Sequence, residues 1–271
     1  MGLITYKNIF NWRKKQIPPI TLKKVLKVDP ALLKDETKMH HLSHIRKWKS
    51  TPWNRRVYYD QSVKWLIPRV NTKGKAPSGK VLIDSSPTKA PTDTAGDVEG
   101  KGRAILHLAV RGPARRGRGH TKGQVVAWKV EGKNYTNLTI QSFIKKKLIK
   151  NLKPTDNFFL DRWGLGRPRA DGSPGRGGHN HPIVRRLIEK NCASHNLLPA
   201  KGCSVDPVEV VFNFWKKDLK KEHRKYIHGV IDVNAIRRAT KKWMREKAPK
   251  YITSGFKQRA DGQKAIELGL F

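Results

Sequence analysis

The chain has 271 residues, of which 58 are Lys or Arg and 21 are Asp or Glu, so its formal net charge is +37. Such an excess of one sign repels itself in a compact monomer, which favours a protein that binds a polyanion, either nucleic acid or an acidic membrane surface. No apolar run approaches the ~20 residues of a membrane span, and the basic residues form no single amphipathic stripe, so the composition favours nucleic acid.

Residues 1–70 are predicted to form a basic arm and a helix. The first 28 residues contain no acid, which is typical of a mitochondrial targeting segment, although an acid-free end also arises by chance in so basic a chain. Asp29 followed by Pro30 places a capping side chain before a proline at the first helical position. This pair predicts a helix that reaches about Lys49.

Aromatic and basic residues are interleaved in the second half of this region. Tyr58 and Tyr59, for example, follow Arg55 and Arg56 closely. Such a mixture suits stacking on the unpaired bases of RNA. Packing of the same aromatic rings in a hydrophobic core is the other interpretation, and the sequence leaves both open.

Residues 71–100 differ from the rest of the chain in composition. Ser, Thr, Pro, Gly and Ala dominate, and this is the only stretch that is locally acidic. It is therefore predicted to be a linker or an exposed loop and to mark a domain boundary.

Residues 101–205 are predicted to form a β-ribbon and helices with two loops rich in Gly and Arg. The runs at 103–110 and 124–130 have strand composition and are bracketed by glycines, which predicts an antiparallel ribbon. The loop at its tip, RGPARRGRGHTKG, contains no acid, and the segment 162–182 repeats its composition. Arginine side chains beside glycines can grip phosphates in bidentate fashion.

These patterns define a set of candidate RNA-binding residues. They comprise the cations of both loops and the arginines beside the tyrosines: Arg111, Arg115, Arg116, Arg118, His120, Lys122, Arg162, Arg167, Arg169, Arg176, His179, His181, Arg55 and Arg56. RNA is favoured over DNA because the charge is dispersed over the whole chain and no helix-turn-helix, zinc finger or basic zipper is present.

Residues 206–271 are predicted to be a helical region with a tail. Asp206-Pro207 followed by Glu209 has the pattern of a helix start, but the run that follows has strand composition, so both interpretations stay open. The last twenty residues are expected to be ordered only by a partner. Further helix starts are predicted at Thr139, Pro182 and Asp232.

The two loops RGPARRGRGHTKG and RPRADGSPGRGGHNHP, the acid-free arm and the dispersed charge together resemble those of a ribosomal protein, and the chain is most similar in character to proteins of mitochondrial ribosomes. The resemblance implies a structural component that binds ribosomal RNA and neighbouring ribosomal proteins in the mitochondrial matrix. It also implies no enzymatic activity, no catalytic residue, no cofactor and no small-molecule substrate.

Two alternatives from other classes remain, an RNA-processing nuclease or accessory RNA-binding factor, and a DNA-binding protein of the nucleoid or chromatin. His179 and His181 invite comparison with histidine-based nucleases, which need a metal ion. Carboxylates are judged too scarce for a paired acid–base site, and Asp156 and Asp161 are expected to act as caps or to pair with arginines.

The expected fold class is α+β, with a small antiparallel β element, peripheral helices and long basic extensions. Cys192, His195 and Cys203 could supply three ligands of a zinc site, but their spacing is irregular and no fourth ligand stands out. Buried thiols are the expected state of the cysteines, and no metal ion is expected.

Overall fold

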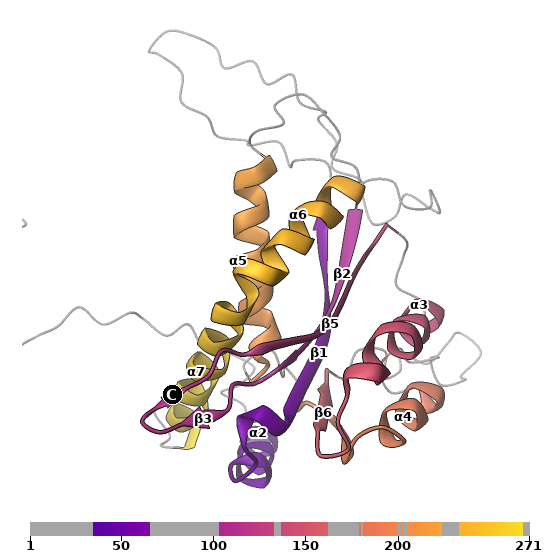
Figure 1. Ribbon diagram of the computed structural model, residues 1–271. Coiled ribbons are helices and arrows are strands. Elements are labelled where there is room, and N and C mark those ends of the chain that lie inside the picture. Colours follow the sequence, from indigo (N-terminus) through magenta and orange to yellow (C-terminus); the bar gives the residue numbers. More distant parts are fainter. Residues whose placement is uncertain are drawn as a thin grey trace, which may run out of the picture.

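The computed structural model describes residues 35–65, 103–132, 137–161, 179, 181–199, 202, 205–223 and 233–267. In them a five-stranded sheet carries helices on both faces, as Figure 1 shows. This architecture confirms the predicted α+β class. Among the described residues, no helix is both long enough and apolar enough to cross a membrane.

The sheet is mixed and has β1 (Arg56–Trp65) at its centre. On one side β1 pairs antiparallel with β2 (Arg103–Arg111), which pairs antiparallel with the edge strand β5 (Gln124–Glu131). On the other side β6 (Asn157–Leu160) runs parallel to β1, and β7 (Ser194–Leu197) runs parallel to β6. The predicted ribbon is confirmed as β2 and β5, but it is part of a larger sheet.

Two hydrophobic cores cover the two faces of the sheet because successive side chains of a strand point in opposite directions. Tyr58 points into the first core, against α5 (Pro207–His223), α6 (Val233–Glu246) and α7 (Ala248–Glu267). Its neighbour Tyr59 points into the second core, so packing accounts for both tyrosines.

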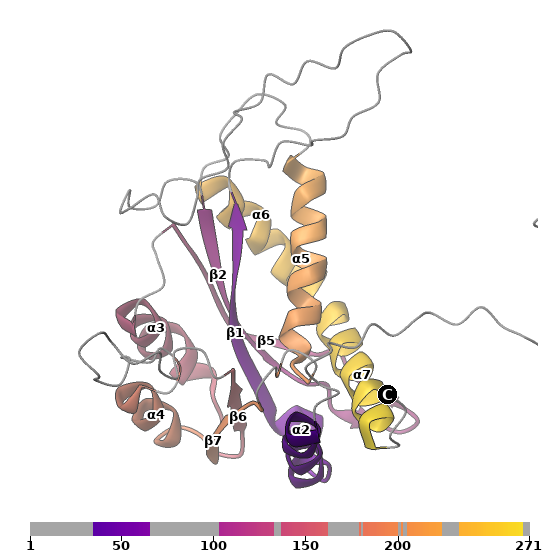
Figure 2. The ribbon, with the colours of Figure 1, turned by 180° about the vertical axis from the view of Figure 1, so that it is seen from behind.

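The second core is closed by shorter helices. They are α3 (Asn137–Phe143), its continuation as a π turn, η3 (Ile144–Leu148), and a 3-10 turn, η4 (Ile149–Asn151), together with α4 (Pro182–Glu189). The two groups of helices lie on opposite sides of the strands in Figure 1 and in the reverse view of Figure 2.

The C-terminal region was predicted only in part. The open question at Asp206 is resolved as a helix, α5, whose first turn begins at Pro207. The expected tail is wrong, because α7 buries Ala248, Ile252 and Phe256, spaced four residues apart, in the first core. Pro249 lies in the first turn of α7, where a missing N–H costs nothing.

The N-terminal region contains α2 (Asp35–Trp48) and the short turn η2 (Trp53–Arg55) before β1. Residues 29–34, where the helix was predicted to begin, lie outside the described residues. Residues 71–100 lie outside them too, and β1 and β2 on either side of that segment are neighbours in the sheet. The proposed domain boundaries remain a prediction.

Candidate active site

Four carboxylates from distant parts of the chain meet at the centre of the sheet. Asp60 lies in the middle of β1, and Asp161 directly follows β6. Because Tyr59 is in register with Leu160 on the adjacent parallel strand, the next residues along both strands also lie side by side. Asp206 and Glu209 come from the start of α5, on the face of the sheet toward which Asp60 points. We call Asp60, Asp161, Asp206 and Glu209 the acid cluster.

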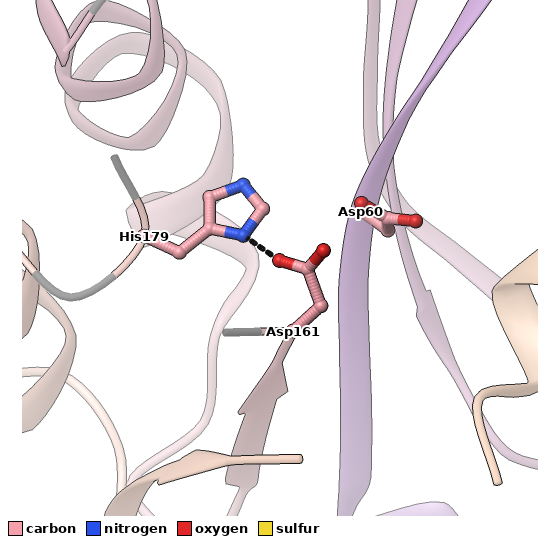
Figure 3. A group of neighbouring side chains, drawn as sticks. All are labelled: Asp60, Asp161 and His179. Carbon is pink, nitrogen blue, oxygen red and sulfur yellow. Dashed lines mark hydrogen bonds and ion pairs between the residues drawn. The ribbon is translucent and has the colours of Figure 1, made fainter. Parts of the chain in front are cut away.

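A histidine extends this cluster. One side-chain ligand atom from each of Asp60, Asp161 and His179 lies within 4.8 Å of the other two. Figure 3 shows the carboxylate of Asp161 between the other two side chains, with His179 Nδ1 paired to its Oδ1. The side chain of His179 is 1% exposed whereas that of Asp161 is 39% exposed, so a substrate can reach Asp161.

Burial and mutual repulsion make the acid cluster electrostatically unfavourable. Burial raises the pKa of Asp60 well above its ordinary value, and the negative charges of Asp206, Asp161 and Glu209 raise it further. Burial, with repulsion from Glu209, also raises the pKa of Asp206 to about 8, although its Oδ1 accepts a hydrogen bond from the Val208 N–H at 2.8 Å. A cation bound among these groups would remove the penalty.

The donor set fits a divalent cation. Carboxylate oxygens are the ligands that Mg²⁺ and Mn²⁺ prefer, and an imidazole nitrogen is a further ligand for Mn²⁺. The residues that would hold such an ion are Asp60, Asp161 and His179, whose ligand atoms lie within 4.8 Å of one another. Asp206 is committed to capping α5 and is 2% exposed.

All candidate residues of the first basic loop except Arg111 lie together on an exposed hairpin. The hairpin is formed by β3 (Arg115–Arg116) and β4 (Gly119–His120), and Gly117 at the turn has a φ of 55°, which favours glycine. The His120 ring stacks on Trp53 with centroids 4.7 Å apart. Exposed at this hairpin are Arg115, Arg116, Arg118, His120 and Lys122.

Two other candidates are buried and serve the fold. Arg111 donates from Nε to Asp156 Oδ1 at 3.1 Å, which confirms that Asp156 pairs with an arginine. Arg56 donates from Nε to the Thr51 carbonyl at 2.9 Å. Arg55 is exposed at the end of η2, directly before β1, and His181 accepts a hydrogen bond from the Ile183 N–H at the start of α4.

The remaining candidates are only partly described. Arg162, Arg167, Arg169 and Arg176 lie outside the described residues, as does Cys203. Cys192 is buried, and burial raises the pKa of its thiol to about 11. Burial disfavours the charged form of His195 and so lowers its pKa. The zinc hypothesis is therefore not tested.

The structure corrects the expectation that carboxylates are too scarce for a paired site. Asp60, Asp206 and Glu209 were not among the candidate residues, and Asp161 was expected only to cap or to pair. The available signal was an Asp inside or directly after an apolar strand, in VYYD and NFFLD, where an unpaired carboxylate is costly. A buried acid that folding does not require is a functional-site candidate.

The strand order is β5-β2-β1-β6-β7, in which three antiparallel-linked strands are followed by two parallel ones. Solved structures with this fold include the Mos1 transposase paired-end complex with the left transposon end, at a TM-score of 0.58 and 14% identity over 92% of this chain and 66% of that chain. The present chain thus spans slightly less than two thirds of that transposase chain.

Two further solved structures share this fold. The Mos1 mariner paired end complex with Mn gives a TM-score of 0.57 at 12% identity, over 98% of this chain and 71% of that one. The Mos1 transposase catalytic domain with raltegravir and Mg gives 0.51 at 12% identity, over 90% and 97% of the two chains. No protein-family model and no curated protein matches the chain.

These likenesses overturn the ribosomal interpretation. The fold is shared with transposase chains, so the resemblance to mitochondrial ribosomal proteins is wrong, and ribosomal RNA and ribosomal proteins are wrong as partners. The expectation of a protein without enzymatic activity is also wrong, because the shared fold includes a transposase catalytic domain and its sheet carries the acid cluster. Dispersed positive charge does not distinguish ribosomal proteins, because it favours binding to any polyanion.

Proposed function

We propose that this protein is a metal-dependent enzyme that cleaves or transfers DNA strands in the manner of a transposase. The observation that carries the proposal is the acid cluster around Asp60, on the central strand of a sheet whose strand order resembles that of ribonuclease H-like domains. The similar structures add support, since they are of a transposase determined with transposon ends or with Mn or Mg.

The chemistry needs in-line attack on a phosphodiester, which is catalysed by positioning and by neutralising charge. A divalent cation held by Asp60 and Asp161 would activate the attacking oxygen and stabilise the developing negative charge. Asp60 is fixed by the hydrogen-bonded centre of the sheet. The buried ring of His179 holds the carboxylate of Asp161 in one orientation.

The third acid is Glu209 rather than Asp206. Asp206 uses its carboxylate to cap α5, and the Nε of Arg259 donates to its backbone carbonyl at 3.0 Å, which anchors this end of the helix. Glu209 lies one turn further along and is half-buried, which leaves it as the acid that we assign to complete the site. Its charge acts on both Asp60 and Asp206.

A plasmid assay tests the proposal. The full chain, incubated with supercoiled DNA, is expected to produce nicked or linear DNA with Mg²⁺ or Mn²⁺ and none with EDTA. Activity that persists in EDTA, or no cleavage or strand transfer with either ion on plasmid or on candidate transposon ends, would refute the proposed function.

The hairpin of β3 and β4 is proposed to contact the DNA backbone. Replacing Arg115, Arg116 and Arg118 together by Ala is expected to lower the slope of log affinity against log salt by about two to three units, because each lost phosphate contact contributes ~0.9. Fluorescence anisotropy over a salt series measures this slope. An unchanged slope would remove the hairpin from the DNA interface.

A mitochondrial location is also proposed, supported by the acid-free composition of residues 1–28. These residues, fused ahead of a fluorescent protein, are expected to direct it to mitochondria in cells. A matched fusion in which Arg13, Lys14 and Lys15 are replaced by Glu should stay outside. Diffuse fluorescence of the first fusion would contradict the proposal.

A further inference from the structure

We propose that a groove formed by α6, β5 and η3 is a second DNA-binding surface, which holds the sugar–phosphate backbone of a duplex away from the acid cluster. The identity of the polymer as DNA rests on the proposed function. The evidence for the groove is the arrangement of its cations, which have no role in the proposed cleavage chemistry.

One wall of the groove is a basic stripe on α6. Arg238, Lys241, Lys242 and Arg245 are spaced i, i+3, i+4 and i+7, so they share one face of the helix, and all four are exposed. The opposite face is buried in the first core and includes Trp243. The stripe extends for roughly 10 Å along the helix axis at 1.5 Å per residue.

The other wall comes from a distant part of the chain. Lys147 in η3 and Lys150 in η4 line the same groove from the opposite face of the sheet, and both are exposed. The floor is the edge strand β5, from Val125 to Val130, and the groove has a volume of about 1050 Å³. In Figure 1, α6 crosses β5 on one side while the α3 region lies on the other.

The charged side chains that line the groove are all basic. No acid lines it among the described residues. Two of its cations have acidic partners just outside, since Lys129 pairs with Glu131 and Arg245 pairs with Glu246 at 2.9 Å. The other cations repel one another across the groove, and a polyanion would convert this repulsion into attraction by displacing counterions.

The dimensions suit a duplex. DNA carries one negative charge per ~1.7 Å of helix axis, so a duplex segment as long as the α6 stripe offers about six charges. Asp60, Leu108 and Trp128 lie in one row across β1, β2 and β5. At roughly 4.8 Å per strand, the groove floor at Trp128 is about 10 Å from the strand position of Asp60. DNA cleaved at the acid cluster could therefore continue into the groove.

A charge-reversal pair tests the groove. Arg238→Glu with Lys242→Glu, four residues apart on α6, is compared with Arg186→Glu and Lys190→Glu, which are exposed and four residues apart at α4. Both variants change the net charge equally. Affinity for a random-sequence duplex is measured by anisotropy in EDTA, and circular dichroism verifies that both variants fold.

The groove variant is expected to lose tenfold or more in DNA affinity at ~0.1 M salt and about two units of salt slope. The α4 variant should lose less than about threefold. Equal losses in the two variants would overturn the proposal, because net charge alone would explain them. Unchanged DNA binding with a change in the oligomeric mass of the groove variant would also overturn it, in favour of a protein strand pairing with β5.

The test is independent of cleavage. Binding is measured without metal, so the loss of DNA affinity in the groove variant can be determined even if the wild-type chain does not cleave DNA. Conversely, metal-dependent cleavage by the wild-type chain together with unchanged binding by the groove variant would refute the groove alone.

Discussion

Replacing Asp60 by Asn is expected to abolish metal-dependent DNA cleavage and, in the same variant, to raise the melting temperature of the metal-free protein. The amide has nearly the shape of the carboxylate but no charge, so it binds a divalent cation poorly. Loss of metal-assisted charge stabilisation, worth several kcal/mol, corresponds to a rate reduced by about 10³-fold or more.

The rise in stability has a separate cause. Burial and the neighbouring acids raise the pKa of Asp60, so at neutral pH the folded protein must either take up a proton or bear a buried charge. Asn carries no such penalty, and the melting temperature should increase by several degrees. A variant that had merely misfolded would show the opposite change.

Two measurements check this result together, namely plasmid cleavage with Mg²⁺ or Mn²⁺ and thermal unfolding in EDTA. Asp261→Asn provides the control, because Asp261 is exposed on α7 and belongs to no cluster described above. Cleavage by the Asp60→Asn variant at the wild-type rate would show that the acid cluster does not catalyse the reaction.

Local signals predicted most of the helices and the ribbon. The proline at Pro182 and the glycines around 103–110 and 124–130 act within a few residues, so their effects can be read directly from the sequence. The central strand β1 gave no such signal, because its aromatic and basic residues suited RNA contact as well as packing. Which of the two applies depends on β2 and β6, which lie far away in the sequence.

The acid cluster could not be predicted from spacing for the same reason. Asp60, Asp161 and Glu209 are brought together by the parallel register of β1 with β6 and by the return of α5 across the sheet. For the basic residues, the sequence did not show which side chains are buried and which are exposed. Arg111 and Arg115 belong to one loop, yet only the structure shows that Arg111 is buried against Asp156 whereas Arg115 is exposed.

The stability of the metal-free protein is expected to fall as the pH rises from about 4 to about 8. The pKa of Asp206 is about 8 in the folded protein, above its ordinary value of 3.8. Between these values the folded state holds a proton that the unfolded state releases, so unfolding becomes easier as pH increases. The contribution of this one group approaches 1.4 kcal/mol per pH unit, to order of magnitude.

Asp206→Asn separates this effect from the other titrating groups. Asn caps a helix about as well as Asp, so the hydrogen bond to the Val208 N–H can be kept while the charge is removed. The variant should therefore lose less stability than the wild type between pH 5 and pH 8, as measured by calorimetry in EDTA. Parallel curves for the two proteins would contradict the raised pKa.

A divalent cation is expected to cancel the same penalty. It binds the ionised carboxylates of the folded state, so its stabilising effect should be larger at pH 8 than at pH 5, where protons compete for the site. For the wild type, Mg²⁺ or Mn²⁺ should therefore flatten the pH profile, and the Asp60→Asn variant should respond much less. An equal rise in melting temperature for both proteins would place the ion elsewhere on the chain and would show that the acid cluster is not the metal site.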